Sequence, residues 1–174
     1  MARSFTAIPG VVLIVCLFLP AMRVCGNPTA PITFPPCYVV YLGGVGVVAM
    51  ALARGRRMLK FGAALSPTLA VLTVGGCLMC HREAAPLVAI VTLWFAVVVP
   101  CAIVRRTPSE RALAIIALMQ GLGSTAWATL LVTDKDGMWG ADLTLAAGIA
   151  LVIGAAVWLD AVAHTPDLPR AIVR

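Results

Sequence analysis

The sequence predicts an all-α integral membrane protein, a bundle of about six transmembrane helices. Of its 174 residues, 61% are hydrophobic and only 11% are charged, whereas a soluble domain carries about 25% charged residues. The mean hydropathy of +1.02 agrees with this class. Six helices of about 20 residues need about 120 residues, which leaves no room for a separate soluble domain. We therefore expect residues 1–174 to form a single transmembrane domain.

Apolar segments between polar or proline-rich loops place the spans along the chain. The expected spans are residues 5–22, 37–53, 61–80, 86–104, 111–133 and 143–163. Arg3 precedes the first span as a basic residue precedes the apolar part of a signal peptide. The small-x-small cleavage pattern is missing after this span, so we expect a retained helix.

Proline residues mark several helix ends. Residues 23–36 contain four prolines, which cannot continue a helix and favour an extended loop. Ser66 followed by Pro67 is typical of a helix start, so the third span either begins there or is kinked at Pro67. The segment 107–110, TPSE, is a capping box with Thr107 as the N-cap, and it opens the fifth span.

The basic residues predict the orientation. If the spans alternate in direction, three basic residues lie on the side opposite the N-terminus: Arg23, Arg82 and Lys135. Ten basic residues lie on the same side as the N-terminus: Arg3, Arg54, Arg56, Arg57, Lys60, Arg105, Arg106, Arg111, Arg170 and Arg174. Short loops rich in Lys and Arg stay in the cytoplasm, so we expect both termini inside. This split explains the net charge of +6 without a nucleic-acid partner. The cluster at residues 54–60 would also attract anionic lipid.

Polar groups are scarce within the predicted spans. Asp160 is the single ionisable residue well inside one, and we expect it to face the interface or to pair with Arg170. Gln120, Ser124 and Thr125 favour hydrogen bonds between helices. Glycines that would allow close helix approach are Gly43, Gly44, Gly46, Gly148 and Gly154.

This pattern favours a non-enzymatic role, as a structural or accessory subunit of a membrane assembly, over a proton-coupled transporter. The expected partners are the lipid bilayer and other membrane subunits. Arginine outnumbers lysine by 11 to 2, a habit of GC-rich bacterial genomes. We therefore expect the protein in a bacterial cytoplasmic (inner) membrane.

The cysteines suggest an alternative function. Cys77-Leu78-Met79-Cys80-His81 matches C-x-x-C-H, the attachment signature of c-type haem. In that chemistry Cys77 and Cys80 would add to the haem vinyl groups, and His81 would ligate the iron. The expected orientation places this segment on the outer side of the membrane, where haem is attached. Haem c is therefore one candidate cofactor, and no separate metal site is expected.

The same cysteines allow two further interpretations. Cys77 and Cys80 can form a redox dithiol, activated by the following His81. Cys25 and Cys37 lie in or beside the first outer loop and offer a second redox pair at the oxidising face. Alternatively, Cys25 and Cys37 form a structural disulfide, worth about 3 kcal/mol through loop closure.

This cysteine layout resembles that of the vitamin K epoxide reductase family and, more loosely, the bacterial membrane oxidases that pass electrons from disulfides to quinone. The resemblance covers residues 1–104 and rests on cysteine placement. It implies that Cys77 and Cys80 match the quinone-facing pair and that Cys25 and Cys37 match the shuttle pair. Quinone-linked thiol–disulfide exchange is then the expected activity.

Overall fold

The fold is mostly helical, as expected. The computed structural model describes residues 2–25, 27–33, 35–79, 100–103, 108–133 and 137–164, without the side chains of residues 2, 24, 35–39 and 69–79. The elements in chain order are η1 (Ala2–Thr6), α1 (Ala7–Cys16), β1 (Met22–Val24), β2 (Asn27–Thr29), η2 (Pro31–Thr33), α2 (Pro35–Leu52), α3 (Arg56–Met79), α5 (Glu110–Thr133) and α6 (Trp139–His164).

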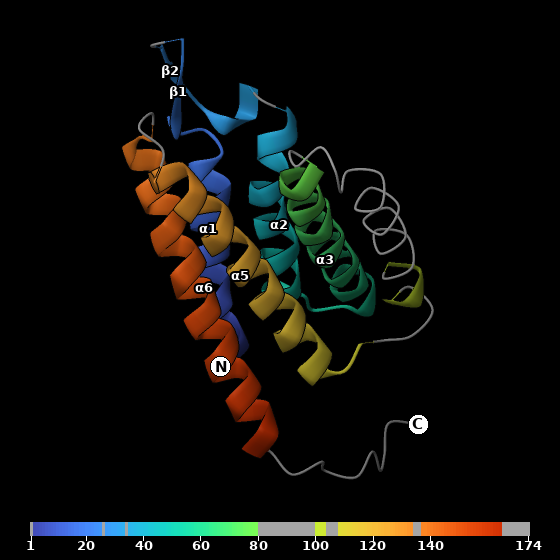
Figure 1. Cartoon of the computed structure of the whole chain (residues 1–174). Coiled ribbons are helices and arrows are strands. Elements are labelled where there is room, and N and C mark those ends of the chain that lie inside the picture. Colours follow the sequence, from blue (N-terminus) through green and yellow to red (C-terminus); the bar gives the residue numbers. More distant parts are fainter. Residues whose placement is uncertain are drawn as a thin grey trace, which may run out of the picture.

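The helices lie side by side as a bundle (Figure 1). Helix α1 packs between α2 and α6, α3 packs on the far side of α2, and α5 packs against α6, α3 and α2. The N-terminus, the end of α2, the starts of α3 and α5 and the end of α6 lie at one end, the lower end in Figure 1. We call this the N-terminal end of the bundle and the opposite one the hairpin end.

Helices α5 and α6 are each long and apolar enough to cross a membrane, and no other helix in the described residues passes the same test. Both agree closely with the expected spans. Helix α5 is capped by Ser109, whose Oγ accepts a hydrogen bond from the Ala112 N–H at 3.2 Å. The N-cap therefore lies two residues after Thr107, because the helix begins at Glu110.

Two other spans differ from the expectation. The first helix ends at Cys16, and residues 17–19 turn by bonds such as Leu17 N–H to Ile14 O before reaching Pro20, which has no N–H to donate. Helix α3 begins at Arg56 and continues through Pro67, so Ser66 is not its N-cap. Of the expected span 86–104, only residues 100–103 lie within the described residues, and these are helical.

Small residues fill the contacts between the helices. Nine of the buried hydrophobic residues are alanines: Ala21, Ala49, Ala63, Ala114, Ala117, Ala128, Ala141, Ala147 and Ala155. The backbones of α2 and α3 meet at Gly46 and Gly62, and a Cβ on Gly62 would lie 2.6 Å from the Gly46 carbonyl oxygen. Gly44 packs similarly on Gly10 of α1. Helix association through small residues is typical of membrane bundles.

The glycines expected to allow close approach do so with one exception. A Cβ on Gly43, Gly44, Gly46 or Gly148 would meet atoms of a neighbouring helix at less than van der Waals distance, whereas one on Gly154 would make ordinary contacts. The sequence did not single out Gly10 and Gly62, which take part in equally close contacts.

A β-hairpin closes the opposite end of the bundle. Strands β1 and β2 are antiparallel, with Met22 opposite Thr29. The hairpin docks on the start of α6: Met138 N–H donates to Ala21 O and Gly140 N–H donates to Pro20 O, each at 3.1 Å. These bonds tie the connection after α1 to the connection before α6.

Candidate functional site

A buried polar cluster joins three helices in the middle of the bundle. Gln120 of α5, which is 1% exposed, donates from Nε2 to the Val40 carbonyl of α2 at 3.1 Å. The Ser66 hydroxyl of α3 donates to Gln120 Oε1 at 3.4 Å. Gln120 Nε2 also lies 3.3 Å from Ser124 Oγ. We call these four residues the Gln120 cluster.

The Gln120 cluster fits only because α2 lacks a side chain at Gly43. A Cβ there would collide with the Gln120 amide. Ser124 satisfies its own hydroxyl by donating to the Gln120 carbonyl at 2.9 Å. A buried polar group without a partner costs about 1–3 kcal/mol, so these bonds make the arrangement of α2, α3 and α5 specific.

The expectation of hydrogen bonds between helices is confirmed for Gln120. Thr125 instead donates to the Gly121 carbonyl of its own helix at 2.8 Å and packs against Gly148 of α6. The sequence did not predict Ser66 as a partner, because its position before Pro67 favoured an N-cap. The cluster contains neutral amide and hydroxyl groups, so its chemistry is positioning rather than acid–base catalysis.

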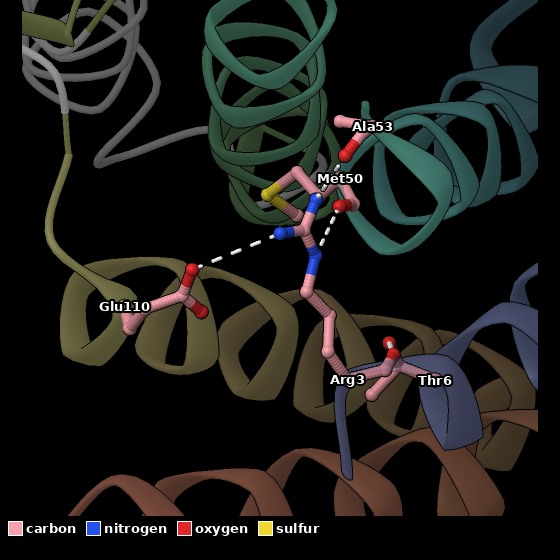
Figure 2. Close-up of polar contacts among 5 residues, drawn as sticks. All are labelled: Arg3, Thr6, Met50, Ala53 and Glu110. Carbon is pink, nitrogen blue, oxygen red and sulfur yellow. Dashed lines mark hydrogen bonds and ion pairs between the residues drawn. The ribbon is translucent and has the colours of Figure 1, made fainter. Parts of the chain in front are cut away.

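A second polar junction lies at the N-terminal end, around Arg3 (Figure 2). Its guanidinium donates from Nε to the Met50 carbonyl at 2.6 Å and from Nη2 to the Ala53 carbonyl at 3.2 Å. A cation at the C-terminus of α2 is favourable, because the helix dipole is negative there. Arg3 Nη1 also lies 3.7 Å from Glu110 Oε1 at the start of α5. Arg3 thus ties the N-terminal segment to two helices.

Replacing Arg3 with alanine should lower the free energy of unfolding by about 2 kcal/mol, because hydrogen bonds to a charged group contribute about 1.5–3 kcal/mol. Glu110→Gln should cost no more than about 0.5 kcal/mol, because Glu110 is 53% exposed and its ion pair is long. Titration of detergent-solubilised variants with a denaturing detergent, followed by circular dichroism, measures both. If Glu110→Gln lowered the free energy of unfolding as much as Arg3→Ala, the ion pair and not the hydrogen bonds to the α2 carbonyls would account for the stabilisation.

The cysteines that the sequence singled out are only partly within the described residues. Cys25 sits in the turn of the β-hairpin at φ 53°, and its thiol is exposed and free. The expected disulfide between Cys25 and Cys37 therefore finds no support. Cys37 lies in the first turn of α2 and Cys77 near the end of α3, but their side chains lie outside the described residues, as do Cys80 and His81 entirely.

The elements that carry these cysteines are gathered at the hairpin end. The β-hairpin, the start of α2 and the end of α3 all lie there (Figure 1). The position of Cys25, Cys37 and Cys77 on the outer side of a membrane stays a prediction. The haem and dithiol interpretations of Cys77, Cys80 and His81 stay predictions. Of the two cysteines expected as apolar fillers, Cys16 is buried, whereas Cys101 is exposed.

Asp160 and His164 lie at the N-terminal end of the bundle, far along α6 from the hairpin. Asp160 Oδ1 lies 3.3 Å from His164 Nδ1 near the end of α6, and both side chains are exposed. The expected position of Asp160 at the membrane interface stays a prediction, and Arg170, the alternative partner, lies outside the described residues. Within those residues no three His, Cys, Asp or Glu side chains gather as a metal site.

Comparisons with protein-family models, with curated proteins and with solved structures find no match to this chain.

Proposed function

We propose that the chain is an integral membrane protein whose helix bundle serves as a structural or accessory subunit of a larger membrane assembly. The observation that carries the proposal is the distribution of side chains. Many small residues and a few polar ones lie in the helix contacts together with buried side chains such as Leu13 and Met50, while many other large apolar side chains are exposed on the outside of the bundle. Ile8 of α1 is 70% exposed and Ile153 of α6 is 59% exposed. An apolar surface of this kind suits lipid or the helices of a partner.

The position of the charges supports the expected orientation. At the N-terminal end the described basic residues are Arg3, Arg54, Arg56, Arg57, Lys60 and Arg111, whereas Arg23 is the one at the hairpin end. This asymmetry favours six spans with both termini in the cytoplasm of a bacterium. The first helix is retained in this proposal, supported by Leu13 and Cys16, which are fully buried.

The close contacts inside the bundle favour a scaffold. The Gly46–Gly62 contact and the Gln120 cluster hold the backbones of α2, α3 and α5 in one arrangement. A rigid bundle can present its outer faces to partner helices without rearranging. The apolar groove between the N-terminal segment and α6, lined by Ile8, Ile153 and Val157, belongs to such a face.

Extraction and purification test the proposal. The protein should stay in the membrane pellet after alkaline carbonate treatment. A reporter that works only in the cytoplasm should be active when it is fused after Arg174, and one that works only outside the cytoplasm should be inactive there. In mild detergent the protein should copurify with other membrane subunits. A reporter active only outside the cytoplasm contradicts the orientation, and a monodisperse monomer without a partner contradicts the accessory role.

Cys25 favours a second candidate function, a thiol-based redox role at the outer face. Its thiol is exposed and free at the end where α2 and α3 place Cys37 and Cys77. In the exchange step, a Cys77–Cys80 disulfide would be reduced to two thiols while the thiols of Cys25 and Cys37 are oxidised to a disulfide. Two electrons and two protons pass between the pairs, so the step balances.

Alkylation of free thiols before and after reduction tests this role. A redox pair should give a mobility shift that Cys77→Ser with Cys80→Ser removes and that the control Cys101→Ser leaves intact. Covalent haem would instead give a peroxidase-active band after denaturing electrophoresis. Thiols that are unreactive under oxidising and reducing conditions, together with the absence of a haem band, would exclude both mechanisms.

A further inference from the structure

The connection between α2 and α3 carries a concentration of positive charge at the N-terminal end of the bundle. Arg54, Arg56 and Arg57 are all exposed there, and we call them the arginine patch. We propose that the arginine patch binds the phosphate group of an anionic phospholipid. This inference rests on the proposed membrane location and adds a specific lipid partner to it.

The arginine patch has no internal counter-charge among the described residues. None of its side chains makes a hydrogen bond or ion pair there. At the end of α2, the carbonyls of Met50 and Ala53 accept hydrogen bonds from Arg3. Arg3 also engages Glu110. Among the described residues, these contacts stabilise Arg3 and not the arginine patch.

The position of the arginine patch on α3 is unfavourable without an anion. Arg56 and Arg57 are the first two residues of α3, and its first turn contains no acidic residue. The N-terminus of a helix is the positive end of its dipole and has N–H groups without intrahelical acceptors. A phosphate at this position would accept hydrogen bonds from the N–H groups and from the guanidinium forks.

Apolar side chains beside the arginine patch favour a lipid over a soluble phosphate. Leu52, Met58 and Phe61 are exposed on the last turn of α2 and the first turns of α3. A phospholipid offers acyl chains to these side chains and a phosphate to the arginines. Inorganic phosphate can satisfy only the arginines.

The test compares bound lipids on the full-length protein in micelles that contain equal amounts of phosphatidylglycerol and phosphatidylcholine, by native mass spectrometry. The wild type should retain phosphatidylglycerol preferentially. In the triple variant Arg54→Gln, Arg56→Gln and Arg57→Gln, the preference for phosphatidylglycerol over phosphatidylcholine should fall about fivefold for each arginine removed. Added inorganic phosphate should not displace the lipid.

The matched control removes the same charge from the side expected to be opposite, as Arg23→Gln, Arg82→Gln and Lys135→Gln. It should retain the wild-type preference. Equal losses in the two triple variants would overturn the proposal in favour of net charge alone, and full displacement by phosphate would overturn the choice of a lipid. A protein that stays in the membrane pellet after carbonate treatment but shows no lipid preference overturns this inference only. A protein that carbonate releases from the membrane overturns the proposed function as well.

Discussion

Replacing Gly62 with alanine is expected to destabilise the bundle by about 3 kcal/mol, at the upper end of the usual cost of overpacking. The new methyl group would lie 2.6 Å from the Gly46 carbonyl oxygen and 2.8 Å from the Met50 nitrogen. Both are backbone atoms, so no rotamer change can relieve the contact, and α2 and α3 must separate. Denaturing-detergent titration followed by circular dichroism measures the loss.

Gly123→Ala is the matched control for this substitution. Gly123 also lies within a helix, but a Cβ there would meet nothing within 4 Å among the described residues. Alanine should therefore leave the stability unchanged or raise it by up to about 1 kcal/mol, because glycine is the poorer helix former. A Gly62→Ala protein as stable as the wild type would contradict the close approach of α2 and α3.

Gln120→Ala is expected to cost about 2–4 kcal/mol. The substitution opens a cavity among α2, α3 and α5 and removes the acceptor of Ser66 and the donor to the Val40 carbonyl. Gln120→Leu keeps most of the volume and loses only the hydrogen bonds, so it should cost about 1 kcal/mol. The difference between the two variants separates packing from hydrogen bonding.

Thr129→Val is the control for Gln120. Thr129 is exposed on the same helix and donates only to the Thr125 carbonyl one turn earlier, at 2.8 Å. Its replacement should change the unfolding free energy by less than about 0.5 kcal/mol.

If Gln120→Leu lowered the unfolding free energy as much as Gln120→Ala, the loss of hydrogen bonds alone would explain the effect, and the predicted contribution of a cavity would be wrong.

The sequence predicted the helices best where an apolar run has clear ends. Helix α5 begins after a serine cap, and α6 is uninterrupted from Trp139 to His164. The first helix was predicted too long because hydropathy does not distinguish an apolar helix from an apolar turn. Leu17 and Leu19 continue the apolar run but bond in i→i−3 turns. The connection that follows it, Pro20 and Ala21, bonds to Met138 and Gly140, which are distant in sequence.

The polar junctions were harder to predict because each depends on residues distant in sequence. Gln120 was recognised as a helix contact, yet Ser66 lies 54 residues away and was interpreted from its local neighbours. Arg3 was treated as a topology signal, and its bond to Met50 spans 47 residues. For the cysteines, the spacing indicated haem attachment or thiol–disulfide exchange. The structure adds that the Cys25 thiol is free and that the elements carrying Cys25, Cys37 and Cys77 lie at the hairpin end.

The position of α1 has a consequence for biogenesis. Helix α1 packs between α2 and α6. Just before α1, the backbone of Phe5 passes close to Gly154 of α6, where an added Cβ would lie 3.6 Å from the Phe5 carbonyl oxygen. Helix α1 therefore meets α6, one of its two neighbours, only after the intervening helices have been synthesised. Until then the side of α1 that faces α6 is uncovered. A chain truncated before α6 would leave this side of α1 uncovered permanently.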